Sequence, residues 1–168
     1  MNSHDRIQIL HQALEERILI LDGAMGTAIQ DCELGPEDFG GPQYEGSNDH
    51  LVLTRPDIIL DIHMQYLSAG SDIVSTNTFS GTSIAQADYG MEAHVYDLNL
   101  AAAKLVRKAV DDTMAAEPGR KCWAMGALGP TNRTASISPS VEDPSFRNVT
   151  FDELVEAYYE QVDGLVAG

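Results

Sequence analysis

The residues best suited to chemistry form a short stretch in which a carboxylate is followed by two glycines, Ile18-Leu-Ile-Leu-Asp-Gly-Ala-Met-Gly-Thr27. Gly23 and Gly26 allow positive φ and a close backbone approach, so we expect bare N–H groups beside the Asp22 carboxylate. This arrangement suits a zwitterion such as an amino acid. Taken alone, the stretch favours a simpler alternative, a tight turn in which Asp22 bonds neighbouring amides.

Three apolar or β-branched runs predict the strands that would position such a site. Ile18-Leu-Ile-Leu21 has the length and composition of a strand buried on both faces. The second predicted strand is Asp72-Ile-Val-Ser-Thr-Asn-Thr-Phe79, and the third is Lys121-Cys-Trp-Ala-Met-Gly-Ala-Leu128. With helices between them, the chain is predicted to be one helix followed by three βα units with long polar loops after the strands.

Helical spacing of apolar residues predicts the remaining elements. An amphipathic helix over 7–14 would cover the end of the sheet, and residues 30–49 are expected to form a long irregular loop. Thr54 is expected to cap a helix that has Pro56 in its first turn and ends at Gly70.

The second half of the chain predicts three more helices. A short one spans about 82–89, and a longer one runs through Leu98 and Met114 until Pro118-Gly119 ends it. Thr150 and Glu153 form a capping box that starts the last helix. The apolar stripe expected to face inward on that helix is Phe151, Leu154, Val155, Tyr158, Val162 and Leu165.

Polar residues follow each predicted strand. Because parallel strands direct their carboxyl ends to one edge, we expect these residues to lie around one mouth, as in (β/α) barrels and doubly wound sheets. They are Asp22, Asn77, Asn132 and Arg133. Because several polar residues are expected at the same place, a ligand-binding role for Asp22 is favoured over a purely structural turn.

Composition limits the partners. The 168 residues contain 26 acids against 10 Lys and Arg, a formal net charge of −16, with no basic cluster. Nucleic acids and anionic membrane surfaces are therefore not expected as partners. Cys32 and Cys122 stand far apart without a CxxC motif, which predicts free thiols and a cytoplasmic location. No signal peptide or membrane span is predicted.

Several enzyme classes lack their motifs. The stretch at 22–27 does not have G-x-G-x-x-G spacing, and a long loop rather than a helix is expected after it, which argues against dinucleotide binding. The five histidines show no metal-type spacing, and neither a P-loop nor a G-x-S-x-G motif is present.

Four motifs together carry a family resemblance. They are Ile20-Leu-Asp-Gly-Ala-Met-Gly-Thr27, Gly46-Ser-Asn-Asp-His-Leu-Val-Leu-Thr-Arg-Pro56, Asp72-Ile-Val-Ser-Thr-Asn-Thr-Phe79 and Gly126-Ala-Leu-Gly-Pro-Thr-Asn-Arg-Thr-Ala-Ser-Ile-Ser-Pro139. They resemble the amino-terminal homocysteine-binding domain of cobalamin-dependent methionine synthases, within the wider homocysteine S-methyltransferase family. The likeness runs from about residue 7 to the last residue and is closer to the cobalamin-dependent than to the betaine-using enzymes.

The resemblance implies a (β/α)₈ barrel that binds homocysteine at its mouth. A zinc ion would hold the substrate sulfur as a thiolate, which would take a methyl group from methylcobalamin to give methionine. Methyltetrahydrofolate would recharge the cobalamin on another domain. The resemblance also implies that Asp22 binds the substrate amino group and that turn amides meet its carboxylate. The substrate-binding residues expected in all are Asp22, Gly23, Ala24, Met25, Asn77, Thr78 and Asn132.

One departure from the family is large. Its three zinc-binding cysteines belong to later strands, and neither Cys32 nor Cys122 lies in a matching motif. A complete barrel needs about 250 residues, so residues 1–168 would supply about three of its eight βα units. We therefore expect an inactive fragment without bound zinc or cobalamin, whose partners are the cobalamin and folate domains of a parent chain.

Such a piece would expose a sheet edge and an uncovered face, so we expect self-association or partial rearrangement. A second hypothesis is a non-catalytic α/β module that binds an amino acid or a partner half-barrel. A third, a barrel enzyme of phosphate or sugar chemistry, lacks the paired carboxylates or phosphate cradle it would need.

Overall fold

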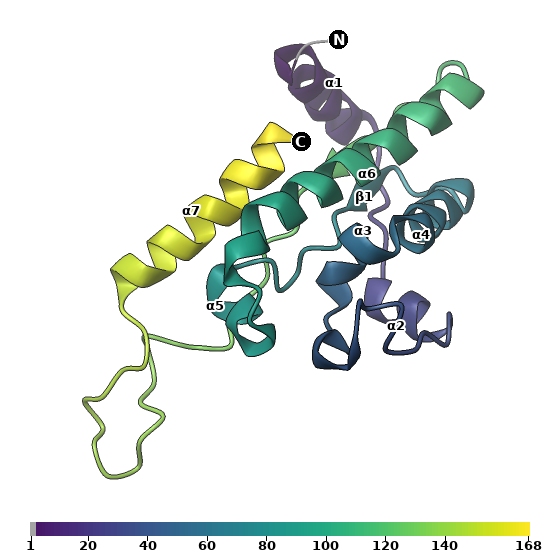
Figure 1. The fold of residues 1–168 in the computed structure, drawn as a ribbon. Helices are drawn as coiled ribbons and strands as arrows, with labels where there is room; N and C mark the ends of the chain where they lie inside the picture. Colours follow the sequence, from purple (N-terminus) through teal and green to yellow (C-terminus); the bar gives the residue numbers. More distant parts are fainter. Residues whose placement is uncertain (1–2) are drawn as a thin grey trace.

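The computed structural model describes residues 3–168, which form an α/β fold (Figure 1). The α-helices are α1 (Ser3–Glu16), α2 (Met25–Gln30), α3 (Leu51–Thr54), α4 (Pro56–Ser68), α5 (Ser83–Gln86), α6 (Val95–Ala116) and α7 (Phe151–Ala167). The strands are β1 (Ile73–Ser75) and β2 (Trp123–Met125), and short 3₁₀ turns are η1 (Pro42–Tyr44), η2 (Asn48–His50), η3 (Ala87–Tyr89) and η4 (Glu92–His94).

The sheet is short and parallel. β1 pairs with β2, with Ile73 opposite Trp123. The first predicted strand contributes one parallel bridge, between Leu21 and Ile73, and the backbone N–H of Asp22 donates to the carbonyl of Ile73 at 2.9 Å. The three segments therefore run in the same direction, as predicted. Their carboxyl ends meet at one edge, although each paired segment is shorter than expected.

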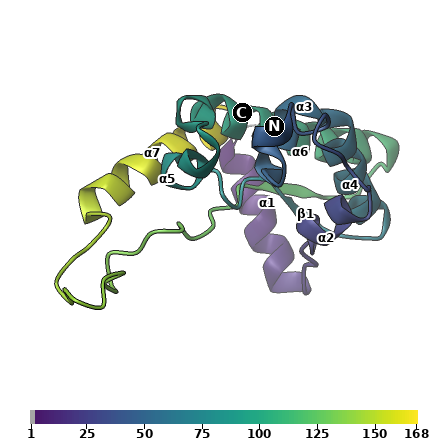
Figure 2. The same cartoon turned by 60° about the horizontal axis from the view of Figure 1, so that its bottom comes forward.

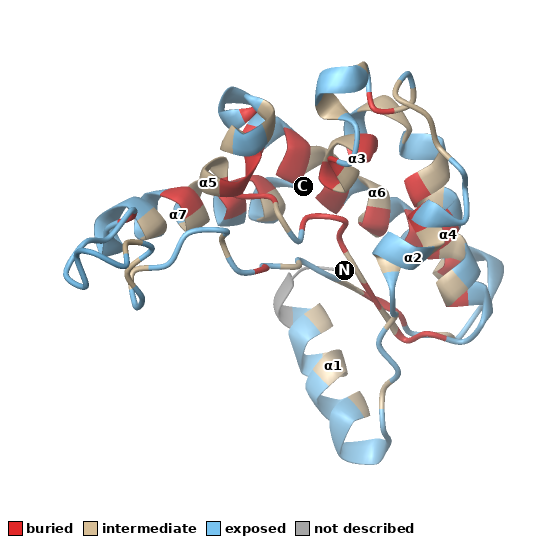
Figure 3. Ribbon diagram, turned by 90° about the horizontal axis from the view of Figure 1, so that it is seen from below, coloured by how far each residue is buried: buried red, intermediate tan, exposed pale blue. Residues whose placement is uncertain are grey.

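The predicted burial of residues 18–21 on both faces is wrong. Ile18 is 89% exposed, Ile20 is 57% exposed and Leu21 is 49% exposed. Helices α4 and α6 pack against the face of the sheet that carries Val74, and Figure 3 shows buried residues on both helices. Within residues 3–168 no further strand pairs beyond segment 18–21, so its apolar side chains have no layer to pack against.

The core lies between the sheet and the helices that pack on one of its faces. One cluster joins α2, α3, α4 and α6, and its buried members are Ile29, Phe39, Leu51, Val52, Ile59, Ile62, Leu98 and Ala102. A second joins α4, β1, α6 and the start of β2, and its buried members are Leu67, Val74, Val106, Ala109, Val110 and Cys122. The long helix α6 contributes to both clusters and so connects the two halves of the core.

Two helix boundaries agree with the predictions and one does not. Gly70 follows α4 with φ of +107°, and the Thr150–Glu153 capping box starts α7. Thr54 does not cap α4, because it ends α3 and its hydroxyl donates to the carbonyl of His50. The break falls instead at Arg55, with φ −134° and ψ 57°, because a residue before proline avoids the helical region.

The predicted inward face of α7 is correct only in part. The buried residues of α7 are Ala157, Gln161 and Gly164, and α7 packs along α6, the helix beside it in Figure 1. Of the predicted stripe, Leu154, Tyr158 and Leu165 are half-buried and Phe151, Val155 and Val162 are exposed. Gly164 explains why this face of α7 lies against α6, since a Cβ at position 164 would lie 2.7 Å from the carbonyl oxygen of Tyr96. Small residues let the two helices approach closely.

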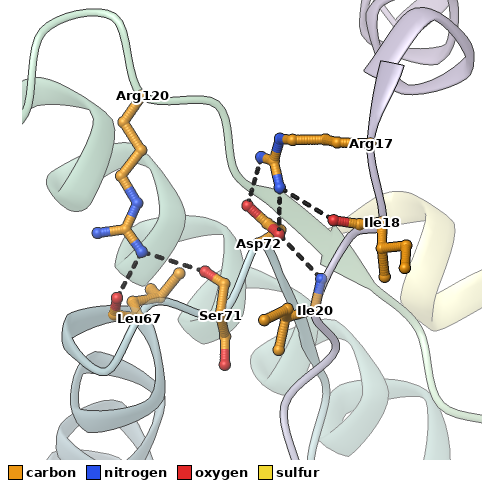
Figure 4. Close-up of polar contacts among 7 residues, drawn as sticks. All are labelled: Arg17, Ile18, Ile20, Leu67, Ser71, Asp72 and Arg120. Carbon is orange, nitrogen blue, oxygen red and sulfur yellow. Dashed lines mark hydrogen bonds and ion pairs between the residues drawn. The ribbon is translucent and has the colours of Figure 1, made fainter. Parts of the chain in front are cut away.

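The amino ends of the strands are held by charged side chains (Figure 4). Arg17 donates to both carboxylate oxygens of Asp72, at 2.8 and 2.6 Å, and Asp72 also accepts from the N–H of Ile20 at 2.8 Å. Arg120 donates to the carbonyls of Leu67 and Ser71. These contacts fix the register of segment 17–20 against β1 at the end of the sheet opposite Asp22.

Helix α1 forms as predicted but projects from the body (Figures 2 and 3). Its residues Ile7 and Leu10 line a cavity of about 300 Å³ together with Ile73 and Trp123, while Ile7 itself is 54% exposed. The helix therefore reaches the sheet without covering it fully. No helix formed by residues 3–168 has the length and apolar character needed to cross a membrane.

Candidate functional site

Asp22 lies at the carboxyl end of segment 18–21, and Ser75 of β1 binds its carboxylate. The Ser75 N–H donates to Oδ2 at 2.9 Å, and the Ser75 hydroxyl donates to Oδ1 at 2.8 Å. Burial raises the pKa of Asp22, and the hydrogen bonds from Ser75 act in the opposite direction. Two bonds leave part of the carboxylate's acceptor capacity free for a cationic ligand.

The turn after Asp22 differs from the prediction in two ways. Neither Gly23 nor Gly26 has positive φ, because the chain enters helix α2 directly and needs no left-handed residue. A helix, α2, therefore follows the turn where a long loop was expected, and the irregular segment predicted for residues 30–49 starts at the end of α2. Among residues 3–168, the backbone N–H groups of Gly23, Ala24 and Met25 donate no hydrogen bond, as expected for a turn and the first residue of a helix.

Asn77 and Thr78 follow β1, but their side chains are engaged within the protein. The Asn77 amide donates to the carbonyl of Asn48 at 2.7 Å, which holds η2 against the end of β1. Thr78 is fully buried, and its hydroxyl donates to the carbonyl of Ala127 at 2.9 Å. Their contact with a substrate stays a prediction, whereas their structural role is visible.

A buried polar network joins the ends of the two strands. The hydroxyls of Thr76 and Thr78 lie 2.6 Å apart, and Thr76 accepts from the N–H of Ala127 at 2.9 Å. Gln161 of α7 donates to the carbonyls of Thr78, at 2.8 Å, and Ala127, at 3.3 Å. The role of Gln161 could not be predicted, because a glutamine on the polar side of an apolar stripe gives no signal of burial.

Asp49 is a second acid near the ends of the strands, and no pattern in the sequence predicted its role. It is 6% exposed, and its Oδ1 accepts from the N–H of Ser80 at 3.0 Å. Burial raises the pKa of Asp49 to about 6, against an ordinary value of 3.8. Asp49 and Asn77 together attach the 46–50 segment to the chain that follows β1.

The structure does not bring Asn132 to Asp22. The Asn132 amide donates to the carboxylate of Asp88 in η3 at 2.7 Å, next to α5. Arg133 lines a cavity with Glu153, Glu156 and Glu160 of α7. Figures 1 and 2 show α5 and α7 on the opposite side of the molecule from α2. Of the four residues expected around one mouth, Asp22 and Asn77 therefore follow adjacent strands, while Asn132 and Arg133 lie outward.

The family of this chain follows from its match to a family sequence model. Residues 19–168 match the sequence model of the family described as homocysteine S-methyltransferase. The chain belongs to the homocysteine S-methyltransferase family. The match begins within the strand that precedes Asp22 and includes all four motifs singled out from the sequence.

Solved structures of a homocysteine S-methyltransferase share the fold. The metallated form of the homocysteine methyltransferase MmuM from Escherichia coli matches with a TM-score of 0.69 and 23% identity, over 92% of this chain and 52% of that one. The oxidized form matches with a TM-score of 0.70 and 23% identity, over 95% of this chain and 53% of that one. The chain thus spans about half the length of these enzymes.

The described residues do not fit the zinc ion that the family resemblance implies. Cys32 is exposed and its thiol donates to the carbonyl of Ala28 at 3.3 Å, while Cys122 is buried beside the start of β2. Burial raises the pKa of the Cys122 thiol, which disfavours the thiolate that a metal needs. No group of three His, Cys, Asp or Glu side chains in residues 3–168 could hold a metal ion.

Proposed function

We propose that this chain forms the amino-terminal, homocysteine-binding part of a homocysteine methyltransferase built as a (β/α)₈ barrel. Family membership supports the reaction class, and the parallel order of segment 18–22, β1 and β2 supports the barrel. The single observation that carries the proposal is the half-buried Asp22 carboxylate, held by Ser75 at the carboxyl end of the sheet. In barrel enzymes this end of the sheet carries the site.

The chain's own residues suit the charged ends of an amino acid. The free acceptor positions of Asp22 would receive the α-ammonium group of homocysteine, since charge-assisted hydrogen bonds to a partly buried carboxylate are strong. The N–H groups of Gly23, Ala24 and Met25 would donate to the α-carboxylate. Asn77 and Thr78 complete the proposed substrate-binding set by shaping the end of β1, whereas Asn132, bound to Asp88, is left out of it.

The branch of the family follows from the motifs. We assign the chain to the cobalamin-dependent methionine synthases, with methylcobalamin charged by methyltetrahydrofolate as the methyl source on other domains of a parent chain. The basis is the resemblance of the four motifs, above all residues 126–139. The exposed thiol of Cys32 suits a reducing compartment, which supports a cytoplasmic location.

Binding of L-homocysteine, measured by calorimetry under reducing conditions at pH 7, tests the proposal. Asp22→Asn keeps the shape of the side chain and removes its charge, so we expect the affinity to fall about 10- to 100-fold. The control Asp31→Asn makes the same charge change at the exposed end of α2 and should bind like the parent. Equal binding by Asp22→Asn and the parent would refute the proposed role of Asp22.

A second candidate function is binding without catalysis. The observation that favours it is that residues 3–168 offer no metal cluster, so the chain alone has no means to activate the substrate thiol that the family resemblance implies. An assay of the purified chain with homocysteine and methylcobalamin should yield no methionine. Sustained methionine formation by these 168 residues would rule out both the binding-only function and the view that the chain needs further βα units.

A further inference from the structure

Ser75 holds the carboxylate of Asp22 by both of its donors. One donor is the backbone N–H and the other is the side-chain hydroxyl, and each reaches a different carboxylate oxygen, at 2.9 and 2.8 Å. Among residues 3–168 no ion pair involves Asp22, so these two bonds provide the main polar support of the carboxylate.

The parallel pairing explains why Ser75 meets Asp22. The N–H of Asp22 donates to the carbonyl of Ile73, so the backbone of segment 18–22 is fixed beside β1. Ser75 is two residues further along β1, and its side chain points to the same face as that of Ile73 because side chains alternate along a strand. The Asp22 carboxylate therefore extends toward the carboxyl end of the adjacent strand β1, where Ser75 carries the only hydroxyl within β1.

The surroundings of Asp22 contain few competing charges. Tyr66 of α4 lies close to the turn, since a Cβ at Gly23 would be 3.7 Å from its hydroxyl. The acid that precedes β1, Asp72, is paired with Arg17 at the opposite end of the strand. Burial thus opposes the ionised form of Asp22, and the donors of Ser75 are what favours it.

We propose that Ser75 is a positioning residue for substrate binding, which fixes the orientation of the Asp22 carboxylate toward the ammonium group of the amino-acid substrate. This inference rests on the proposed function. The backbone N–H at position 75 is present with any residue except proline, so the side-chain hydroxyl is the part of the contact that the sequence can change. Ser75 does not itself touch the substrate in this arrangement.

The first test follows the Asp22 carboxyl carbon by NMR during a pH titration without ligand. Ser75→Ala removes one of the two bonds, so Asp22 should titrate at higher pH than in the parent. Ser75→Thr retains the hydroxyl and should restore the parental titration. Circular dichroism of both variants verifies that the fold is retained. An unchanged Asp22 titration in Ser75→Ala would overturn the inference.

The second test compares homocysteine with 4-mercaptobutanoate, which has the thiol and the carboxylate but no ammonium group. At pH 6, Ser75→Ala should bind homocysteine about three- to tenfold more weakly than the parent. Its affinity for 4-mercaptobutanoate should stay within about twofold. Equal weakening for both ligands would show a merely structural effect and refute the role of Ser75. Failure of the parent to bind homocysteine would instead refute the proposed function, whatever the NMR titration shows for Ser75.

Discussion

Asp49 and His63 are buried titratable residues whose protonation affects stability in opposite directions. Asp49 is 6% exposed and His63 is fully buried, with no hydrogen-bond partner for either ring nitrogen. Burial raises the pKa of Asp49 to about 6 and lowers the pKa of His63 to about 4. Both groups therefore titrate between about pH 4 and 6.5, and their effects on the free energy of unfolding partly cancel in the parent protein.

We predict that Asp49→Asn stabilises the protein at neutral pH. Because the folded pKa lies above the unfolded value of 3.8, the stability contributed by Asp49 is complete below pH 4 and is lost as the pH rises through about 6. The asparagine oxygen can still accept from Ser80. Urea unfolding at pH 7 should show a gain of about 1–3 kcal/mol, which shrinks toward pH 4. A variant less stable than the parent at pH 7 would contradict this.

The opposite pH dependence is predicted for His63→Leu. The folded pKa of His63 is depressed, so its contribution is complete above pH 6.5 and is lost as the pH falls through about 4. Replacement by leucine should reduce the acid sensitivity of unfolding and add about 1–3 kcal/mol at pH 7, since an unpaired polar ring is removed. The exposed His11→Leu serves as control and should change neither.

At the scale of the elements, α7 shows how a helix can be predicted well in position and wrongly in orientation. Its capping box and its length follow from local sequence. Its buried face depends on which neighbours it meets, since Gly164 lies against α6 and Gln161 donates to the carbonyls of Thr78 and Ala127. The predicted burial of residues 18–21 was wrong for a related reason. Their composition predicted a covering layer on each face, and residues 3–168 do not supply both layers.

Some residues of the candidate site could be predicted from the sequence, and others could not. Asp22 and Asn77 could be placed at adjacent strand ends because an apolar run followed by a polar residue marks the end of a buried strand. Ser75 and Asp49 could not, because a single serine within a strand and an aspartate in a loop are common and have no periodic pattern. Asn132 lies outward because its long loop is not confined by pairing, and its partner Asp88 is set by the tertiary fold.

The contact between α6 and α7 leaves no room for a side chain at position 164. A Cβ at Gly164 would lie 2.7 Å from the carbonyl oxygen of Tyr96 and 2.9 Å from the Cβ of Asn99, so Gly164→Ala must push the helices apart. We expect a loss of about 1–3 kcal/mol in urea unfolding. Gly26→Ala is the matched control, because nothing lies within 4 Å of a Cβ there and alanine favours the helix. Equal stability of the two variants would contradict the tight packing.

Over the whole molecule, the exposed apolar residues include a set on α7. On α7 they are Phe151 (73% exposed), Val155 (49%), Tyr159 (72%), Val162 (39%) and Val166 (80%). Within residues 3–168 no strand pairs with the outer edge of β2, and the chain spans about half of the matched enzymes.

We predict that the 168-residue chain self-associates through the exposed stripe of α7, against the repulsion of its net charge of −16. Sedimentation velocity should therefore show association that grows as NaCl is raised from about 20 to 500 mM, since salt screens the repulsion and leaves the apolar contact intact. The double variant Val155→Glu with Tyr159→Glu should stay monomeric. Lys104→Glu on the exposed face of α6 changes the net charge by the same two units and should associate nearly like the parent. A parent that is monomeric at every salt concentration would show that the stripe is too small to hold two copies together.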